Sequence, residues 1–297
     1  MSIGHCAKLT ALYAVMRYED WVLIEMDEMT LEPRTWGSCW DHFGARLVDL
    51  VEPSVGSLVL DIGTGGGASL YPAAKRVGPK GHVTGIETCE SCFNRTSGEI
   101  ERCRIHNAEI KFMDACEMSF EDESFDFAIS GFIGWDNYFD FEEDKHIAED
   151  AIMSEVFRVL KKGGIVGFSG WAKADASVIM RKLLLTYLPS DSFHISNVKA
   201  WSHTETKRGW EKILSKAGFV NIKTWVEEYD MVYSSKDEWW QEVVDLDWQE
   251  VMEYLEHNAI VSVAELKKQA FFLLNDYEKP DGVHQARNAV LAIGTKP

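Results

Sequence analysis

The strongest chemical signal in the sequence is a glycine-rich turn that follows an acidic residue. The apolar run Ser57–Ile62 contains Asp61 near its end and leads directly into Gly63-Thr64-Gly65-Gly66-Gly67. Glycine lets a backbone turn sharply and approach a ligand closely, and the free N–H groups at the start of a following helix favour polar or anionic atoms. Nicotinamide and flavin enzymes share much of this pattern. The acid at position 61 separates the cases, because it suits an ammonium group and would repel a pyrophosphate.

Two more acidic residues follow apolar runs farther along the chain. Glu87 ends the run His82–Glu87, about twenty residues after the glycines, where a carboxylate can accept both hydroxyl groups of a ribose. Asp114 follows the run Glu109–Met113, and a side-chain acceptor there can meet the amino group of an adenine. Together with Asp61, these acids favour an adenosine ligand that carries an amino-acid end.

The elements that must position these acids follow from the apolar pattern. Between residues 57 and 170, short apolar runs alternate with amphipathic segments, and the runs are Ser57–Ile62, His82–Glu87, Glu109–Met113, Phe125–Ser130 and Ile165–Ser169. Strand–helix alternation of this kind predicts a parallel sheet with helices on both faces. Ligands of such sheets bind outside the carboxyl ends of the strands, which is where the three acids would lie.

Helices are expected around and after this region. Residues 36–51 place apolar side chains at three- and four-residue steps, and Asp144–Leu160 is followed by a stop signal of two lysines and two glycines. Pro72 lies inside the helix expected after the glycine turn, so this helix either begins late or bends. Farther on, the pattern predicts helices at Asp175–Tyr187, Thr204–Ala217, Ser235–Glu256 and Val261–Asp276, and strands at Phe219–Glu228 and Asn288–Gly294.

These motifs resemble those of class I S-adenosyl-L-methionine-dependent methyltransferases of the type-11, quinone-biosynthesis-like family. The resemblance covers about residues 36–170 and includes Phe125-Asp126-Phe127-Ala128-Ile129 and Glu155-Val156-Phe157-Arg158-Val159-Leu160-Lys161-Lys162-Gly163-Gly164, in which Lys162 replaces the usual proline. It implies an α/β fold: a doubly wound, seven-stranded, mostly parallel, Rossmann-like sheet whose last strand is antiparallel. It further implies an enzyme that transfers a methyl group from S-adenosyl-L-methionine to a small-molecule acceptor.

The resemblance also implies roles for single residues. The amino-acid end of the cofactor would be held by Asp61, Gly63, Thr64, Gly65 and Gly67, the ribose by Glu87 with Thr88 beside it, the adenine by Asp114, Ala115 and Cys116, and the region below the sulfonium by Ser130, Gly131 and Phe132. Several of these residues also have an ordinary structural interpretation. Gly67 can permit close packing of a helix, Asp114 can cap a turn, and Cys116 can be a small apolar wall.

The acceptor side is less clearly marked, because methyl transfer is an in-line displacement that needs alignment more than a dedicated catalytic group. Trp135, Asp136 and Tyr138 follow the fourth predicted strand and Trp171 follows the fifth, which makes them candidate pocket residues. Trp135, Asp136 and His203 are the candidate catalytic groups; for His203, a capping or surface position is the more ordinary interpretation.

The domain organisation predicted from these elements has three parts. An N-terminal helical cap would span residues 1–55, the methyltransferase core 56–230 and 287–297, and a helical insertion 231–286. Within the insertion, Trp240, Val244 and Trp248 share a helical face, which indicates a packed core. The alternatives are a lid, formed with the N-terminal helices over an apolar or aromatic acceptor, and a homodimer interface.

Charge and cysteine content argue against several other classes. Lys and Arg number 30 against 48 Asp and Glu, which gives a net charge of −18 and disfavours nucleic acids and anionic membranes. No apolar stretch reaches the length of a membrane span. We therefore expect a cytoplasmic protein with free thiols and no metal. Cys89 and Cys92 form a lone CxxC, interpreted as two thiols on a first helical turn rather than half of a zinc site or a redox pair.

Two alternative functions are kept beside the methyltransferase. One is a protein that binds the cofactor as a regulatory or binding module without turnover, against which the three intact acids argue. The other is a nicotinamide-dependent oxidoreductase. Asp61 before the glycines, and a closing hairpin made of the last two predicted strands, argue against this second alternative.

Overall fold

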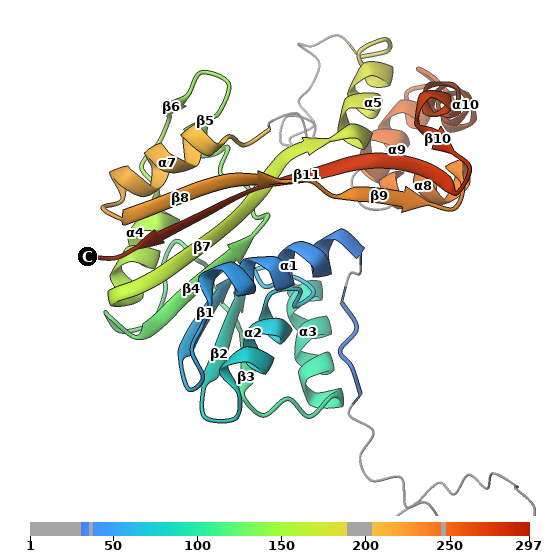
Figure 1. The fold of residues 1–297 in the computed structure, drawn as a ribbon. Coiled ribbons are helices and arrows are strands. Elements are labelled where there is room, and N and C mark those ends of the chain that lie inside the picture. The colour runs from blue at the N-terminus through green and yellow to red at the C-terminus, as the bar shows by residue number, and fades with distance from the viewer. Residues whose placement is uncertain (1–30, 36–37, 189–203, 245–247) are drawn as a thin grey trace, which may run out of the picture. The chain divides into compact units, whose positions relative to one another are not determined.

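The computed structural model describes residues 31–35, 38–188, 204–244 and 248–297, and the described residues from Pro33 onward belong to one compact unit (Figure 1). Its centre is a sheet with five parallel strands, β1 (Leu58–Ile62), β2 (His82–Glu87), β3 (Ala108–Phe112), β4 (Phe125–Gly131) and β7 (Leu160–Ala174). β11 (Gly282–Thr295) lies antiparallel between β7 and β8 (Val220–Glu227). The order β3-β2-β1-β4-β7-β11-β8 confirms the predicted mostly parallel sheet with an antiparallel last strand.

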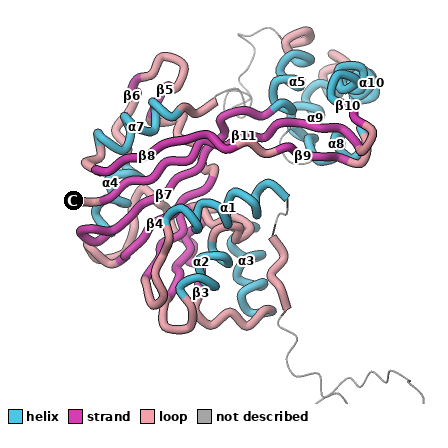
Figure 2. The backbone as a smooth tube through the Cα atoms, viewed as in Figure 1, coloured by secondary structure: helices cyan, strands magenta, loops and turns pink. Residues whose placement is uncertain are grey.

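Helices cover both faces of this sheet, as the alternation of buried side chains requires (Figures 1 and 2). Val59 and Ile129 face α1 (Ser38–Val51) and α2 (Leu70–Val77), while their neighbours Leu60 and Ala128 face α4 (Ala151–Val159) and α7 (Lys207–Lys216). α3 (Glu90–Arg102) packs along β2 and β3. The strands are therefore buried on both sides, which is why they read as continuous apolar runs in the sequence.

The helix after the glycine turn begins late, which settles the conflict raised by Pro72. α2 starts at Leu70 and places Pro72 third in the helix. The first four N–H groups of a helix have no intrahelical partner, so the missing N–H of proline costs nothing there.

The predicted helix Asp144–Leu160 is wrong in its first half. A short hairpin of β5 (Phe139–Asp140) and β6 (Lys145–His146) occupies that region, and Asp144 has a left-handed backbone with φ 55°. α4 begins only at Ala151, where the Asp150 carboxylate accepts a hydrogen bond from the N–H of Met153 at 2.8 Å. An aspartate in this N-cap position satisfies an otherwise unpaired helix N–H.

The C-terminal helices gather around a core of their own at one end of β11 (Figure 1). This part contains α5 (Asp175–Leu184), β9 (Asp230–Tyr233), α8 (Lys236–Val243), α9 (Gln249–His257), α10 (Val263–Leu273), the 3-10 helix η3 (Leu274–Tyr277) and β10 (Glu278–Lys279). Trp239, Trp240 and Trp248 are buried in it, as the core-stripe interpretation expects. The last strand is longer than predicted because its first half pairs with β9 before the second half enters the sheet.

Helix α1, near the N-terminus, packs against the central sheet and is part of its hydrophobic core. Phe43, Leu47 and Val51 are fully or almost fully buried, and the helix contacts β7, β4 and α2. The remainder of the predicted cap, residues 1–30, lies outside the described residues. Within the described part of the chain, none of the helices is both long enough and apolar enough to cross a lipid bilayer.

Candidate functional site

A cavity of about 480 Å³ opens at the carboxyl ends of β1, β2 and β4, a size typical of small-molecule sites. Most of the acids and glycines selected from the sequence meet in its wall. The predicted residues that line it are Asp61, Gly63, Thr64, Gly65, Glu87, Thr88, Asp114, Ala115, Gly131, Phe132 and Tyr138. They come from five separate segments of the chain, so the fold brings together what the sequence keeps apart.

The glycine turn is held in place by the neighbouring strand. The N–H groups of Gly63 and Thr64 donate to the carbonyl oxygen of Ile86 at 2.9 and 3.1 Å. Gly63 has φ 66°, and a Cβ built on it would lie 2.2 Å from Cγ2 of Ile133. Only glycine combines this backbone conformation with such a close approach.

Asp61 is a buried acid with an unused acceptor. Its side chain lies at the end of β1, the residue is 2% exposed, and among the described residues its Oδ2 atom has no hydrogen-bond partner. Burial raises the pKa of Asp61 to about 7, against the lowering effect of Thr64, and the charge of Glu87 adds to the increase. An ammonium group of a ligand would both pair with this oxygen and stabilise its charge.

Glu87 accepts three backbone N–H groups from two segments at the cavity wall. One carboxylate oxygen accepts the N–H of Gly65 at 2.8 Å, and the other accepts the N–H groups of Thr88 and Cys89, each at 2.9 Å. The carboxylate therefore joins the glycine turn to the start of α3. A carboxylate has two lone pairs on each oxygen, and three of the four are used here, so the oxygen that accepts the Gly65 N–H retains one lone pair for a ligand hydroxyl.

Asp114 both caps a turn and lines the cavity. Its Oδ1 atom accepts the N–H of Cys116 at 2.8 Å, which is the structural role considered from the sequence. Asp114 and Ala115 also belong to the cavity wall, together with Met113. Asp114 thus combines the capping role with a place in the cavity wall.

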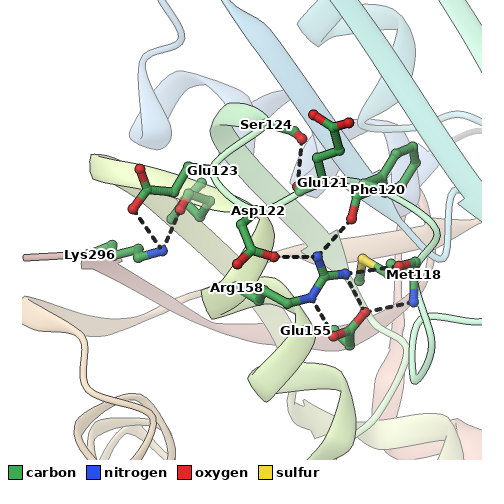
Figure 3. A network of polar contacts seen from close by, with 10 residues as sticks. Met118, Phe120, Glu121, Asp122, Glu123, Ser124, Glu155, Arg158 and Lys296 are labelled. Carbon is green, nitrogen blue, oxygen red and sulfur yellow. Dashed lines mark hydrogen bonds and ion pairs between the residues drawn. The ribbon is translucent and has the colours of Figure 1, made fainter.

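The Glu155–Arg158 pair of the family-like motif holds the loop that follows Asp114 through a network of polar contacts (Figure 3). The guanidinium of Arg158 donates to the carbonyl oxygens of Met118 and Phe120 at 2.9 and 2.7 Å and pairs with Glu155 through two bonds of 2.7 Å. Glu155 in turn accepts the N–H of Met118 at 2.7 Å. The motif therefore fixes the loop that follows Asp114 and does not itself contact the cavity.

An aromatic cluster borders the cavity beyond Gly131. The rings of Phe132 and Trp171 lie 4.1 Å apart at 30°, and Trp40 meets them edge-on at 5.4 and 5.2 Å. Phe132 has φ 57°, an uncommon conformation for a residue with a side chain. Its N–H donates to the carbonyl oxygen of Ser169 at 2.8 Å, which holds it in this conformation. Trp40 and Phe132 line the cavity, whereas Trp171, expected there from the sequence, contacts both rings without lining it.

Other predicted site residues lie outside the cavity wall. Ser130 is buried and donates to the carbonyl oxygen of Ile62 at 3.0 Å, so it joins β4 to β1. Gly67 lies against Tyr71, whose ring would be 2.3 Å from a Cβ at position 67, which is the packing role considered above. Cys116 is exposed, with its Sγ 3.5 Å from the hydroxyl of Tyr138. Asp136 is half-buried, and His203 lies outside the described residues.

Trp135, expected in the acceptor wall, is a core residue instead. It is 1% exposed, and its ring packs 5.1 Å from the rings of both Phe168 and Trp210. Its indole N–H donates to Asp150 Oδ2 at 2.5 Å. Burial of the large indole ring is favourable, and Asp150 supplies the hydrogen-bond acceptor that a buried indole N–H requires.

Of the two helical segments predicted to cover the acceptor pocket, only the N-terminal one contributes described residues to the cavity wall. Of the described residues in 231–286, none lines the cavity, because their apolar side chains pack around the core that they share with α5. From the N-terminal part, Trp40 and Gly44 of α1 do line it. A Cβ at position 44 would lie 2.3 Å from the carbonyl oxygen of Ala68, so α1 crosses closely over the glycine turn.

Several wall residues were missed from the sequence. Cys89 and Cys92 lie directly beyond Glu87 on the first turn of α3, a position that the spacing alone could have indicated. Ser69, Ser169 and Trp40 carry no local signal, because only the fold brings them beside Gly131 and Phe132.

A second buried acid lies behind the aromatic cluster. Glu205 is 6% exposed and accepts the indole N–H of Trp210 at 2.7 Å, while its own N–H donates to the carbonyl oxygen of Trp171 at 2.8 Å. Burial raises the pKa of Glu205 to about 8, and the charge of Asp136 contributes to the increase. Glu205 does not line the cavity, so its first role is to position Trp171 and Trp210.

The residues present fit S-adenosyl-L-methionine. The unpaired, buried oxygen of Asp61 suits its ammonium group, and acceptors for its hydroxyl and amino groups are present at Glu87 and Asp114 of the same cavity wall. Among the described residues, no group of three or more His, Cys, Asp or Glu side chains is placed to hold a metal ion.

Part of the chain is similar in sequence to curated methyltransferases. Aklanonic acid methyltransferase DauC of Streptomyces sp. strain C5 is 39% identical over 89 residues, or 30% of this chain and 40% of that protein. Demethylmenaquinone methyltransferase of Listeria welshimeri is 32% identical over 115 residues, or 39% of this chain and 45% of that protein. The matched segments thus span less than half of these curated relatives.

The fold has a counterpart among solved structures. The YcgJ protein of Bacillus subtilis aligns with a TM-score of 0.54 at 16% identity, over 86% of this chain and 98% of that one. The model of a family described as a methyltransferase domain matches residues 53–258, which is more than half of the chain. The chain therefore belongs to this family of class I S-adenosyl-L-methionine-dependent methyltransferase domains.

Proposed function

We propose that the cavity holds S-adenosyl-L-methionine along its wall and that the methyl group passes to a small-molecule acceptor lying against Trp40 and Phe132. Asp61 and the turn at Gly63–Gly65 would hold the amino-acid end, Glu87 the ribose, and Asp114 with Ala115 the adenine. The single observation that carries the proposal is the buried, unpaired Oδ2 atom of Asp61 in the same cavity as these acceptors and rings.

The cofactor supplies an electrophilic methyl group on a positively charged sulfur. The chain's own contribution would be to orient this group and to exclude water, since an in-line displacement gains most from alignment. The aromatic faces of Trp40 and Phe132 suit a cationic sulfur, because the face of an aromatic ring attracts positive charge. The catalytic assignment of Asp136 and His203 stays a prediction.

An aromatic or apolar acceptor is the class that the wall favours. Trp40 and Phe132 offer flat apolar surface, and Trp171 supports Phe132 from behind at a ring distance of 4.1 Å. The relatives named above carry the names of aklanonic acid and demethylmenaquinone, which are small molecules. The net charge of −18 also favours small neutral or cationic acceptors over nucleic acid.

For the lid, we propose that α1 rather than the helical insertion forms the closing wall over the cofactor. Its support is the place of Trp40 and Gly44 in the wall and the close crossing of α1 over the glycine turn. The helical insertion would then form a separate hydrophobic core beside the first half of β11, where β9 pairs with it.

The test is cofactor binding followed by turnover. S-adenosylhomocysteine at a hundredfold excess over its dissociation constant should stabilise the protein by about 2.7 kcal/mol, with no comparable effect of NAD. A panel of phenols, hydroquinones and amines with radiolabelled cofactor should then yield a methylated aromatic product, and Trp40→Ala should raise the KM for that acceptor. A shift in melting temperature with NAD alone would contradict the assignment. Binding without methyl transfer to any acceptor would favour a binding module.

A further inference from the structure

Two cysteines of the cavity wall form a pair at the start of a helix. Cys89 is the N-cap residue of α3 and Cys92 lies in its first turn. The Sγ atom of Cys89 accepts the N–H of Cys92 at 3.3 Å and lies 3.2 Å from the hydroxyl oxygen of Ser91. Cys89 is exposed, Cys92 is half-buried, and both line the cavity. The pair is thus within reach both of solvent and of a bound ligand.

The surroundings divide the two thiols into different roles. Hydrogen bonds from Cys92 and Ser91 lower the pKa of the Cys89 thiol, as expected for a sulfur at a helix N-terminus. Burial, together with the neighbouring Cys89, raises the pKa of the Cys92 thiol to about 11. An exposed sulfur with a lowered pKa beside a half-buried partner is the arrangement of an attacking and a resolving cysteine.

The same turn is bonded to the residue proposed to hold the ribose. The N–H of Cys89 donates to Glu87 at 2.9 Å, and the opposite oxygen of Glu87 accepts the N–H of Gly65 at 2.8 Å. A disulfide would bring the two sulfurs to about 2.05 Å of each other, so we expect Cys89 Sγ to leave its capping position at the N–H of Cys92 and the first turn of α3 to adjust. The movement would displace the Cys89 N–H and, through it, the carboxylate of Glu87.

We propose that Cys89 and Cys92 are a thiol–disulfide switch that controls cofactor binding, with a low-molecular-weight disulfide such as oxidised glutathione as the oxidant. The Cys89 thiolate attacks the disulfide, forms a mixed disulfide and releases one thiol. The Cys92 sulfur, after losing its proton to solvent, attacks Cys89 Sγ and releases the second thiol. Two protein thiols are oxidised and one small disulfide is reduced to two thiols. The effect on binding rests on the proposed role of Glu87.

The experiment compares reduced and oxidised full-length protein. After incubation in glutathione buffers of increasing oxidation, acid quenching and peptide mass mapping should find the Cys89–Cys92 disulfide before any other. Calorimetry should then show S-adenosylhomocysteine binding at least about tenfold weaker than to the reduced protein, which is about 1.4 kcal/mol. Treatment with a dithiol should restore the original affinity. Bound S-adenosylhomocysteine should also slow alkylation of both cysteines.

Matched variants separate the pair from cysteine oxidation in general. Cys103→Ser changes a half-buried cysteine at the other end of α3 and should leave the oxidant response unchanged. In Cys92→Ser the reaction should stop at a mixed disulfide of glutathione on Cys89. The S-adenosylhomocysteine affinity of this oxidised variant is compared with that of the same variant when reduced. Absence of the Cys89–Cys92 disulfide, or equal affinity of the two redox forms, overturns the proposal. Failure of the reduced protein to bind S-adenosylhomocysteine overturns the proposed function instead.

Discussion

The carboxylate of Glu87 accepts the backbone N–H of Gly65 at 2.8 Å, so the acid at the end of β2 holds the glycine turn that follows β1. The other oxygen of the same carboxylate holds the start of α3 through Thr88 and Cys89. One side chain therefore shapes the cavity before any ligand enters. A ligand that uses Glu87 meets a group already fixed in position, which reduces the entropy lost on binding.

Replacing Glu87 should lower both the stability of the protein and its affinity for the ligand. In Glu87→Gln the amide nitrogen must face a backbone N–H on one side, which breaks at least one charge-assisted hydrogen bond. We expect S-adenosylhomocysteine affinity to fall at least about tenfold and the protein to lose about 1–3 kcal/mol of stability. Calorimetry and urea unfolding measure the two effects. Glu90→Gln, which removes an exposed acid in the first turn of α3, should leave affinity unchanged and cost less than about 1 kcal/mol of stability.

Asp61 should make the stability of the ligand-free protein depend on pH. Its pKa rises from 3.8 when unfolded to about 7 when folded, so the folded state binds more protons between these values. Stability from this group therefore falls as the pH rises from about 4 to about 7 and is constant above. Asp61→Asn removes the effect, and urea unfolding at pH 8 should find the variant more stable than the parent. Exposed Asp276→Asn serves as the control.

The same group should make cofactor affinity depend on pH with the opposite sign. Only the ionised carboxylate pairs with an ammonium group, so binding should be about tenfold weaker at pH 6 than at pH 8 for a pKa of about 7. Asp61→Asn should bind weakly at both values. Calorimetry with S-adenosylhomocysteine tests this, and an unchanged slope in the variant would assign the titration to another group, such as Glu205.

The sheet and the cofactor side could be predicted from the sequence because they depend on local patterns. Strands buried on both faces read as apolar runs, and the carboxyl ends of parallel strands must meet at one edge. Asp61 and Glu87 lie at the ends of such runs and Asp114 follows one, and all three line the cavity. Each of these acids could be placed once the strand that carries or precedes it was identified.

The acceptor side could not be predicted in this way, because its residues depend on contacts between distant segments. Trp40 reaches the cavity only because α1 packs across the glycine turn, and Ser169 only because β7 lies beside β4. Trp135 follows a strand as Asp114 does, yet it turns inward to reach Phe168, Trp210 and Asp150. Local spacing carries no information on which of two such loops points into the core.

Two glycines should respond to alanine with opposite signs. Gly63 has φ 66°, and a Cβ there would lie 2.2 Å from Ile133, so Gly63→Ala should destabilise the protein and reduce S-adenosylhomocysteine binding. Gly98 lies exposed within α3, and a Cβ there would meet no other atom within 4 Å, so Gly98→Ala should stabilise by about 0.5–1 kcal/mol. Thermal unfolding of both variants, with and without ligand, decides the prediction; equal effects of the two would contradict it.

Substitution of Trp135 should mainly lower stability, whereas substitution of Trp40 should mainly lower the affinity for the acceptor. Trp135 is 1% exposed and bonded to Asp150, so Trp135→Ala should cost about 3–5 kcal/mol in unfolding free energy. Trp135→Phe retains a ring but leaves the Asp150 oxygen unpaired, and should cost about 1–3 kcal/mol.

Trp40 is half-buried and lines the cavity, so Trp40→Ala should lose less stability but weaken the binding of an aromatic acceptor. Urea unfolding gives the first quantity, and KM with the acceptor found in the panel gives the second. The contrast depends on location alone, because both changes remove the same indole ring. If Trp135→Ala instead left stability unchanged and raised KM, Trp135 would belong to the acceptor wall after all, and the core contacts that place it beside Phe168 and Trp210 would not persist in solution.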